Sequence, residues 1–179
     1  MPRYIAFLRA INVGGHVVKM TELCGLFSAL GFREVESFIA SGNVIFSAAS
    51  GSPAALEQKI EAHLRKALGY DVNTFLRTPA EVRAIAAHPA FPAARVQACP
   101  TFCVGLIARP LAPAAARSLM ALRSADDDFH VDAREVYWLS RLRQGQAKFC
   151  GAVFERTVKI PITFRGMGTV ARLAAKYPS

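Results

Sequence analysis

The sequence has no run of apolar residues long enough to cross a membrane. Its longest stretch without a charged residue lies between Glu36 and Glu57, and it contains Ser41-Gly42-Asn43, Gly51 and Pro53. A hydrocarbon-spanning helix does not tolerate so many polar and helix-breaking residues. The first residues lead directly into a strand-like segment, without the apolar region and cleavage site of a signal peptide. We therefore expect a soluble, cytoplasmic protein with no membrane partner.

Cysteine is scarce, and the four cysteines form no recognisable framework. No two are spaced as C-x-x-C, and Cys99 and Cys103 have no matching cysteine or histidine pair at zinc-ligand spacing. A domain of this size does not need disulfide staples. We expect buried, reduced thiols at Cys24, Cys99, Cys103 and Cys150.

The motifs of common enzyme and cofactor sites are also missing. The sequence contains neither G-x-G-x-x-G nor a P-loop, and it has no HExxH and no G-x-S-x-G. The acidic residues 126–128 are more typical of a solvated turn than of a cation site. We expect no cofactor and no metal, and whether the protein is an enzyme stays open. The histidines without metal-ligand spacing are His16, His63, His88 and His130.

Apolar residues are plentiful, and the charge is predominantly positive. Of 179 residues, 53% are hydrophobic and 20% charged, which indicates one compact domain or two small halves that share a core. Lys and Arg number 22 against 13 Asp and Glu, for a formal net charge of +9. Residues 141–179 hold eight of the basic residues and only one acidic residue. Such a charge attracts nucleic acid, nucleotides or other phosphates, although it can equally belong to a solvated surface.

Apolar runs and helix-capping signals alternate through the first half. Ser52-Pro53 and Thr78-Pro79-Ala80-Glu81, a capping box, are clear helix starts, and Thr21 is a plausible N-cap. Gly31 and Gly69 are typical helix ends. The expected strands are residues 4–11, 35–39, 44–46 and 72–76, and the expected helices are 21–30, 53–68 and 79–88.

After a segment rich in Ala and Pro, interpreted as a linker, the same order of elements repeats. Each half is expected to be β-α-β-β-α-β followed by one more helix, which is the ferredoxin-like order. The fold class is therefore α+β, with two antiparallel sheets whose helices pack on one face. The expected domains are residues 1–89, a linker at 90–100, and residues 101–179. The second-half strands are expected at 101–108, 129–131, 136–139 and 161–165, with helices at 113–122, around 149–154 and around 170–174.

Several motifs stand out along the chain: Leu8-Arg9-Ala10-Ile11-Asn12-Val13-Gly14-Gly15, Lys19-Met20, Leu30-Gly31-Phe32, Ser41-Gly42-Asn43-Val44-Ile45-Phe46, Thr78-Pro79-Ala80-Glu81, and Thr163-Phe164-Arg165 with Thr169-Val170. Together they resemble a bacterial family catalogued as domain of unknown function 1697. The resemblance implies a compact α+β protein of two ferredoxin-like halves, and it implies no activity. Family members usually carry Arg-Asn-Trp-Asn-Thr-Val near the C-terminus, where this chain has Arg165-Gly166-Met167-Gly168-Thr169-Val170.

Three polar turns that contain glycine are the candidate binding elements, at residues 12–19, 41–43 and 165–169. The first and third are expected to follow a strand and precede a helix, where unsatisfied N–H groups and the helix dipole hold anions. Alternatively, the glycines only supply left-handed conformations and Thr169 only caps the last helix. The candidate ligand-binding residues are Arg9, Asn12, Gly14, Gly15, Lys19, Ser41, Asn43, Arg165 and Thr169.

These features support three hypotheses of function. The leading one is binding of an anionic ligand, which could be a phosphate-bearing small molecule, a nucleotide or a nucleic acid. The second is a small enzyme that acts on a phosphorylated metabolite in the same cleft. The third is a protein-interaction or dimerisation module that uses an exposed sheet edge. Residues 41–46 lack the basic residue and first aromatic of RNA-recognition modules, so base stacking on that sheet is not supported.

Overall fold

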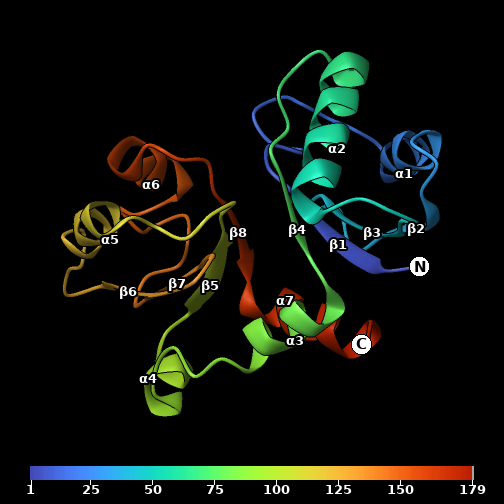
Figure 1. Ribbon diagram of the computed structural model, residues 1–179. Helices are drawn as coiled ribbons and strands as arrows, with labels where there is room; N and C mark the ends of the chain where they lie inside the picture. The colour runs from blue at the N-terminus through green and yellow to red at the C-terminus, as the bar shows by residue number, and fades with distance from the viewer. Residues whose placement is uncertain (179) are drawn as a thin grey trace. The chain divides into compact units, whose positions relative to one another are not determined.

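The computed structural model describes residues 1–178, which divide into two compact units (Figure 1). The first unit comprises Met1–Val82 and the C-terminal segment from Leu173, and the second comprises Arg83–Arg172. Each unit contains one four-stranded antiparallel sheet. The expected α+β class with two ferredoxin-like halves is confirmed, since both sheets have the strand order of that fold.

In the first unit the sheet order is β2-β3-β1-β4, and helices α1 and α2 lie on one face of the sheet (Figure 1). Strand β1 is interior, as expected, and five of its six residues are buried. The core beneath the helices joins Phe27 of α1 and Ile60 of α2 to Phe46 of β3. The elements are β1 (Arg3–Leu8), α1 (Met20–Ala29), β2 (Arg33–Ser37), β3 (Asn43–Ser47), α2 (Pro53–Leu68) and β4 (Thr74–Arg77).

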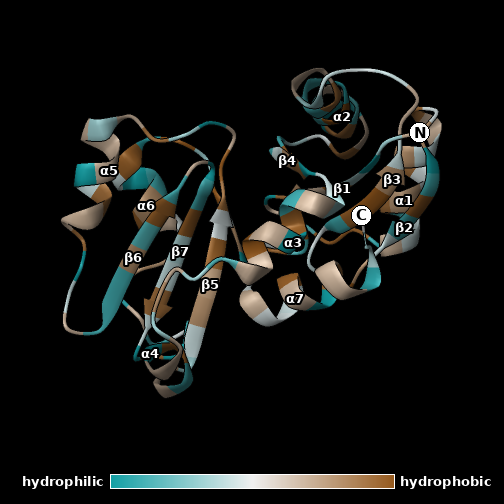
Figure 2. Ribbon diagram, turned by 60° about the horizontal axis from the view of Figure 1, so that its bottom comes forward, coloured by the Kyte–Doolittle hydropathy of each residue, from teal (hydrophilic) through white to brown (hydrophobic). Residues whose placement is uncertain are grey.

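In the second unit the sheet order is β6-β7-β5-β8, with α5 and α6 on one face (Figure 1). Trp138 of β7 and Phe154 of α6 belong to one buried cluster, and hydrophobic residues dominate β5 (Figure 2). The elements are α3 (Pro79–Ala87), α4 (Ala93–Ala98), β5 (Thr101–Leu106), α5 (Pro113–Met120), β6 (Asp127–Asp132), β7 (Glu135–Ser140), α6 (Gly151–Val158), β8 (Thr163–Gly166) and α7 (Met167–Lys176), of which α3 and α7 straddle the unit boundaries.

The strongest local signals in the sequence act as predicted. The Ser52 hydroxyl accepts a hydrogen bond from the Ala55 N–H, and Gly69 ends α2 in the left-handed conformation. At the start of α3, the Thr78 N–H donates to the Glu81 carboxylate (2.7 Å) and the Glu81 N–H donates to the Thr78 hydroxyl (3.2 Å). The capping box is therefore confirmed.

Two helices differ from expectation. Helix α1 begins at Met20 with Lys19 as its N-cap, so Thr21 lies inside the first turn and does not cap it. The segment 90–100, interpreted as a linker, contains α4 at Ala93–Ala98. Alanine has the highest intrinsic helix propensity, and the helix starts directly after Pro92, where a proline is tolerated.

The central strands of both sheets are buried on both faces. In the first unit Ile5, Phe7 and Ile45 alternate with the core residues of β1 and β3, and each is at most 1% exposed. In the second unit Val104 and Tyr137 are likewise at most 1% exposed. These strands therefore offer no exposed platform on which bases could stack. No helix within residues 1–178 is long and apolar enough to span a bilayer.

Candidate functional site

Two loops of the first unit meet at one end of its sheet. Strands β1 and β3 are antiparallel partners, with Phe7 opposite Asn43, so the chain that leaves β1 lies beside the chain that enters β3. The Leu8 N–H donates to the Gly42 carbonyl over 2.9 Å. We call residues 9–19 and 38–43 together the loop cluster. It contains the first two of the three turns that the sequence singled out.

Asn12 joins the two loops through its side-chain amide. Its Nδ2 donates to the Ala40 carbonyl (3.0 Å), and its Oδ1 accepts from the Val18 N–H (2.8 Å). The second bond closes residues 12–18 into a loop immediately before α1. Asn12 has φ 57°, a left-handed conformation that asparagine adopts more readily than most residues.

The second loop is tied down from within. Asn43 is fully buried, and its Nδ2 donates to the Phe38 carbonyl (3.0 Å) and the Ser41 hydroxyl (2.9 Å). Gly42 has φ 77°, and a Cβ atom there would lie 3.0 Å from the Ile11 Cβ. The roles of Asn43 and Gly42 are therefore to shape the cluster, and Ser41 is a partner in that structure.

Within the closed loop, the backbone around two successive glycines is exposed. Gly14 (φ 60°) and Gly15 (φ 84°) are both left-handed, and a Cβ atom at either position would meet no other atom within 4 Å. Residues 12–17 are all exposed. The loop runs into the N-terminus of α1, where the N-cap residue Lys19 is exposed and its side chain makes no capping hydrogen bond.

Aromatic and charged groups border this part of the cluster. The His16 ring stacks on Tyr70 with 3.8 Å between centroids. Burial, and to a smaller extent the nearby Glu22 carboxylate, raises the pKa of Tyr70 above its ordinary value. Arg9 is partly buried, and its backbone N–H donates to the Asn73 carbonyl. Lys19 is thus the exposed cation of the loop itself, and Glu22 occupies the first turn of α1.

The third predicted turn is not a turn. Strand β8 ends at Gly166 and α7 begins at Met167, so Arg165 lies in a strand and Thr169 lies within the helix. The alternative in which Thr169 caps the helix is therefore wrong as well. Arg165 is 7% exposed, and its Nη1 donates to the Thr163 hydroxyl (2.7 Å) and the Phe164 carbonyl (3.0 Å). Burial lowers the pKa of Arg165 to about 10, so the guanidinium is still charged at neutral pH.

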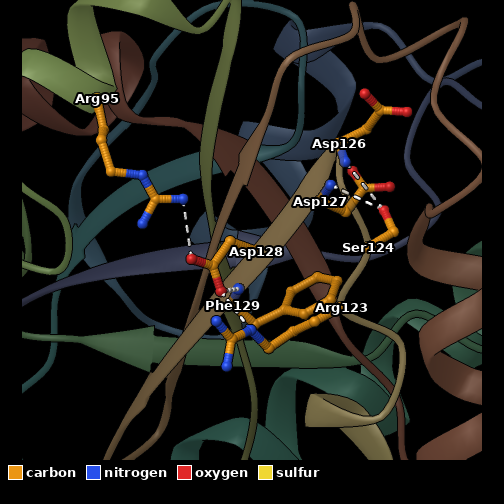
Figure 3. A network of polar contacts seen from close by, with 7 residues as sticks. All are labelled: Arg95, Arg123, Ser124, Asp126, Asp127, Asp128 and Phe129. Atoms are coloured by element: carbon orange, nitrogen blue, oxygen red, sulfur yellow. Dashed lines mark hydrogen bonds and ion pairs between the residues drawn. The ribbon is translucent and has the colours of Figure 1, made fainter.

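The acidic run 126–128 takes part in a network of ion pairs and hydrogen bonds in the second unit. Asp128 pairs with Arg95 (3.0 Å) and Arg123 (2.8 Å), as Figure 3 shows. Asp127 is 5% exposed and accepts a hydrogen bond from the Trp138 indole N–H (2.8 Å). The expected solvated turn is therefore wrong for these two residues, because β6 begins at Asp127.

A pocket of about 310 Å³ lies against this network. Arg95, Arg123 and Arg141 line it together with the three aspartates, so positive and negative groups largely compensate there. None of these arginines is a predicted site residue. Arg123 precedes the acidic run closely in the sequence, but Arg95 approaches it from α4, a helix in the segment that was interpreted as a linker.

Comparison with known proteins places these features in a family. The family model described as "Protein of unknown function (DUF1697)" matches residues 1–137. The chain belongs to this family. The region that the DUF1697 model matches includes the whole loop cluster and ends before Arg165 and Thr169.

A solved structure resembles the chain over nearly its whole length. It is the conserved bacterial protein SP0830 from Streptococcus pneumoniae, with a TM-score of 0.77, 24% sequence identity, and 98% of each chain covered. At that identity the likeness shows only that the two proteins share a fold. No curated protein matches the chain.

The four cysteines of this DUF1697 protein are free, as expected, but only Cys103 is buried. Cys24 and Cys99 are half-buried, and Cys150 is exposed, so the expectation of uniformly buried thiols is wrong. Burial raises the pKa of Cys103 to about 11. No cluster of three or more potential metal-ligating side chains occurs within residues 1–178.

Proposed function

We propose that the loop cluster of the first unit binds a small anionic ligand, and that this is how the protein functions in the cytoplasm. The observation that carries the proposal is the Asn12-closed loop, with two successive left-handed glycines leading into α1. Gly14 and Gly15 form a turn, and successive backbone N–H groups of a turn can make a concavity that attracts anions. The N-terminus of a helix adds unsatisfied N–H groups and the positive end of its dipole.

The residues of the cluster take different parts in this proposal. The N–H groups of Gly14 and Gly15 and the Lys19 ammonium group contact the anion. Asn12, Ser41 and Asn43 hold the loops in place through the hydrogen bonds described above. Arg9, at the start of the cluster, adds positive charge. Arg165 and Thr169 lie in the second unit and are not needed for this site.

Calorimetric titration with pyrophosphate tests the proposal. We expect saturable binding to the wild-type protein that weakens as the salt concentration rises, because ions screen exposed charges. Lys19→Ala should weaken binding about tenfold, which corresponds to about 1.4 kcal/mol. The matched control is Lys66→Ala, an exposed lysine on α2 of the same unit, which should bind as the wild type does. Equal affinities of the two variants, or no binding at low salt, would contradict the proposal.

A second candidate function is self-association through the same loops. Val13, Val17 and Ile39 all belong to the loop cluster, and their exposures are 56%, 84% and 41%. Exposed apolar groups gathered in one place are typical of interaction surfaces. Sedimentation velocity should then show a dimer that Val13→Ser combined with Val17→Ser disrupts. A wild-type protein that stays monomeric at high concentration excludes this function.

A further inference from the structure

Two histidines of the second unit turn their ring nitrogens toward each other. His88 follows α3, and His130 lies in the middle of β6. Their Nε2 atoms are 3.2 Å apart. Neither residue belongs to the loop cluster, so a role for this pair is independent of the proposed anion site.

Neighbouring groups hold both rings in place. His88 stacks on Tyr137, with 5.0 Å between centroids and planes 19° apart. Phe91 and His130 form a T-shaped pair, with centroids 6.5 Å and planes 70° apart. On the far side of the His88 ring, Nδ1 lies 3.5 Å from the Asp132 carboxylate. The packing fixes the direction of both Nε2 atoms.

The carboxylate also favours one of the two tautomers of His88. A carboxylate beside Nδ1 favours the proton on that atom, which leaves the Nε2 lone pair directed at His130. This is the arrangement of metal-bound histidines, whose second nitrogen donates to a carboxylate that orients the ring and raises its basicity. An ion can therefore replace the single proton that two facing Nε2 atoms would otherwise share.

The distances agree with a shared ion. Nitrogens 3.2 Å apart and each about 2.05 Å from one ion subtend about 103° there, close to a tetrahedral angle. With such bonds the ring centroids would lie about 5 Å apart, and the observed separation is 5.2 Å. His88 is 27% exposed, so an ion can reach the pair from solvent.

We propose that His88 and His130 form a binding site for a divalent transition metal ion, with Asp132 positioning His88. Two neutral imidazoles select ions such as Zn²⁺, Ni²⁺ and Cu²⁺ over Mg²⁺ and Ca²⁺, which prefer oxygen ligands. Because the described residues contain no cluster of three ligands, water completes the coordination. We expect the affinity of the site to rise in the order Co²⁺, Ni²⁺, Cu²⁺.

Calorimetric titration of the full chain with NiCl₂ tests this site. We expect one equivalent of Ni²⁺ per chain, no binding of Mg²⁺, and at least a tenfold loss of affinity in His130→Asn. His88→Phe should lose as much affinity, although it keeps an aromatic ring against Tyr137. Thermal unfolding of this variant checks that it retains the fold. Asp132→Asn should weaken binding about tenfold, because it removes the orienting carboxylate. His16→Asn and His63→Asn, both in the first unit, are matched controls that should bind as the wild type does.

A spectroscopic measurement identifies the ligands independently. Electron paramagnetic resonance of the Cu²⁺-loaded protein should show coupling to two imidazole nitrogens in the wild type and to one in His130→Asn. The proposal is overturned if the wild type binds no Ni²⁺ or Cu²⁺. It is also overturned if binding survives in both His88→Phe and His130→Asn, since the ion would then lie elsewhere, for example at exposed Cys150.

Discussion

Arg77 and Arg165 occupy equivalent positions in the two halves of the chain. Arg77 in β4 pairs with Ile5 of β1, and Arg165 in β8 pairs with Val104 of β5. Each lies two residues before the next helix and is buried, with exposures of 1% and 7%. In each, Nη1 donates to the carbonyl of the preceding residue. The duplicated fold therefore repeats a buried arginine as well as its strand order.

Removing either buried arginine should destabilise the protein. Arg77→Ala and Arg165→Ala should each lower the free energy of unfolding by about 2–4 kcal/mol, because each leaves buried polar partners unsatisfied. Urea denaturation measures the effect. Arg117→Ala, on the exposed surface of α5, is the control and should change stability by less than about 0.5 kcal/mol. Buried arginines that behave like Arg117 would show that their hydrogen bonds contribute nothing.

Gly42 should be less tolerant of alanine than Gly69, although both have left-handed backbones. A Cβ atom at Gly42 would lie 3.0 Å from Ile11 and 3.3 Å from Leu8, whereas one at Gly69 would meet nothing within 4 Å. Both substitutions incur backbone strain of about 1 kcal/mol. Gly42→Ala should lose about 1–3 kcal/mol more because of overpacking. Thermal unfolding of the two variants measures the difference, and equal losses would mean that the loops are loosely joined.

The Glu34 carboxylate should titrate at unusually low pH. It accepts hydrogen bonds from the Ser47 hydroxyl (2.6 Å) and from Arg3 (3.2 Å), which together hold its pKa below the ordinary value. The stability from these bonds is present above the ordinary pKa and is lost as the pH falls through the lowered pKa. Carboxyl ¹³C NMR follows the titration. Ser47→Ala should raise the pKa, while Ser50→Ala, an exposed neighbour, should leave it unchanged.

Cysteine alkylation should separate the exposed from the buried thiol. With a pKa of about 11, Cys103 is almost entirely protonated at pH 8 and is also sterically covered. The thiolate is the reactive form, so Cys103 should react far more slowly than Cys150. Mass spectrometry after timed treatment with iodoacetamide measures both rates. Comparable rates would mean that the sheet around β5 opens frequently.

The elements that the sequence predicts well are those determined locally. Ser52 and the Thr78–Glu81 capping box identify their helix starts because the bonds join residues three apart. The burial of Asp127 could not be predicted in the same way. Its carboxylate is satisfied by the Trp138 indole N–H of the neighbouring strand, and that contact forms only when β6 and β7 pair in the folded sheet.

The candidate site was predictable in part for the same reason. Gly14 and Gly15 indicate an unusual backbone by their residue type, but the bond from Asn12 to Ala40 joins residues 28 positions apart. The predicted turn at 165–169 failed because glycine at 166 suggested a break. In the structure Gly166 is the last residue of β8, and the helix starts without an intervening turn.

The most direct test of the anion site is a titration of ¹⁵N-labelled protein with pyrophosphate, followed by amide NMR. We expect saturable shifts concentrated on Gly14, Gly15 and the first residues of α1, with much smaller shifts in the second unit. In Lys19→Ala the same amides should shift with a weaker apparent affinity. Shifts that are absent, or that centre on residues outside the loop cluster, would contradict the account.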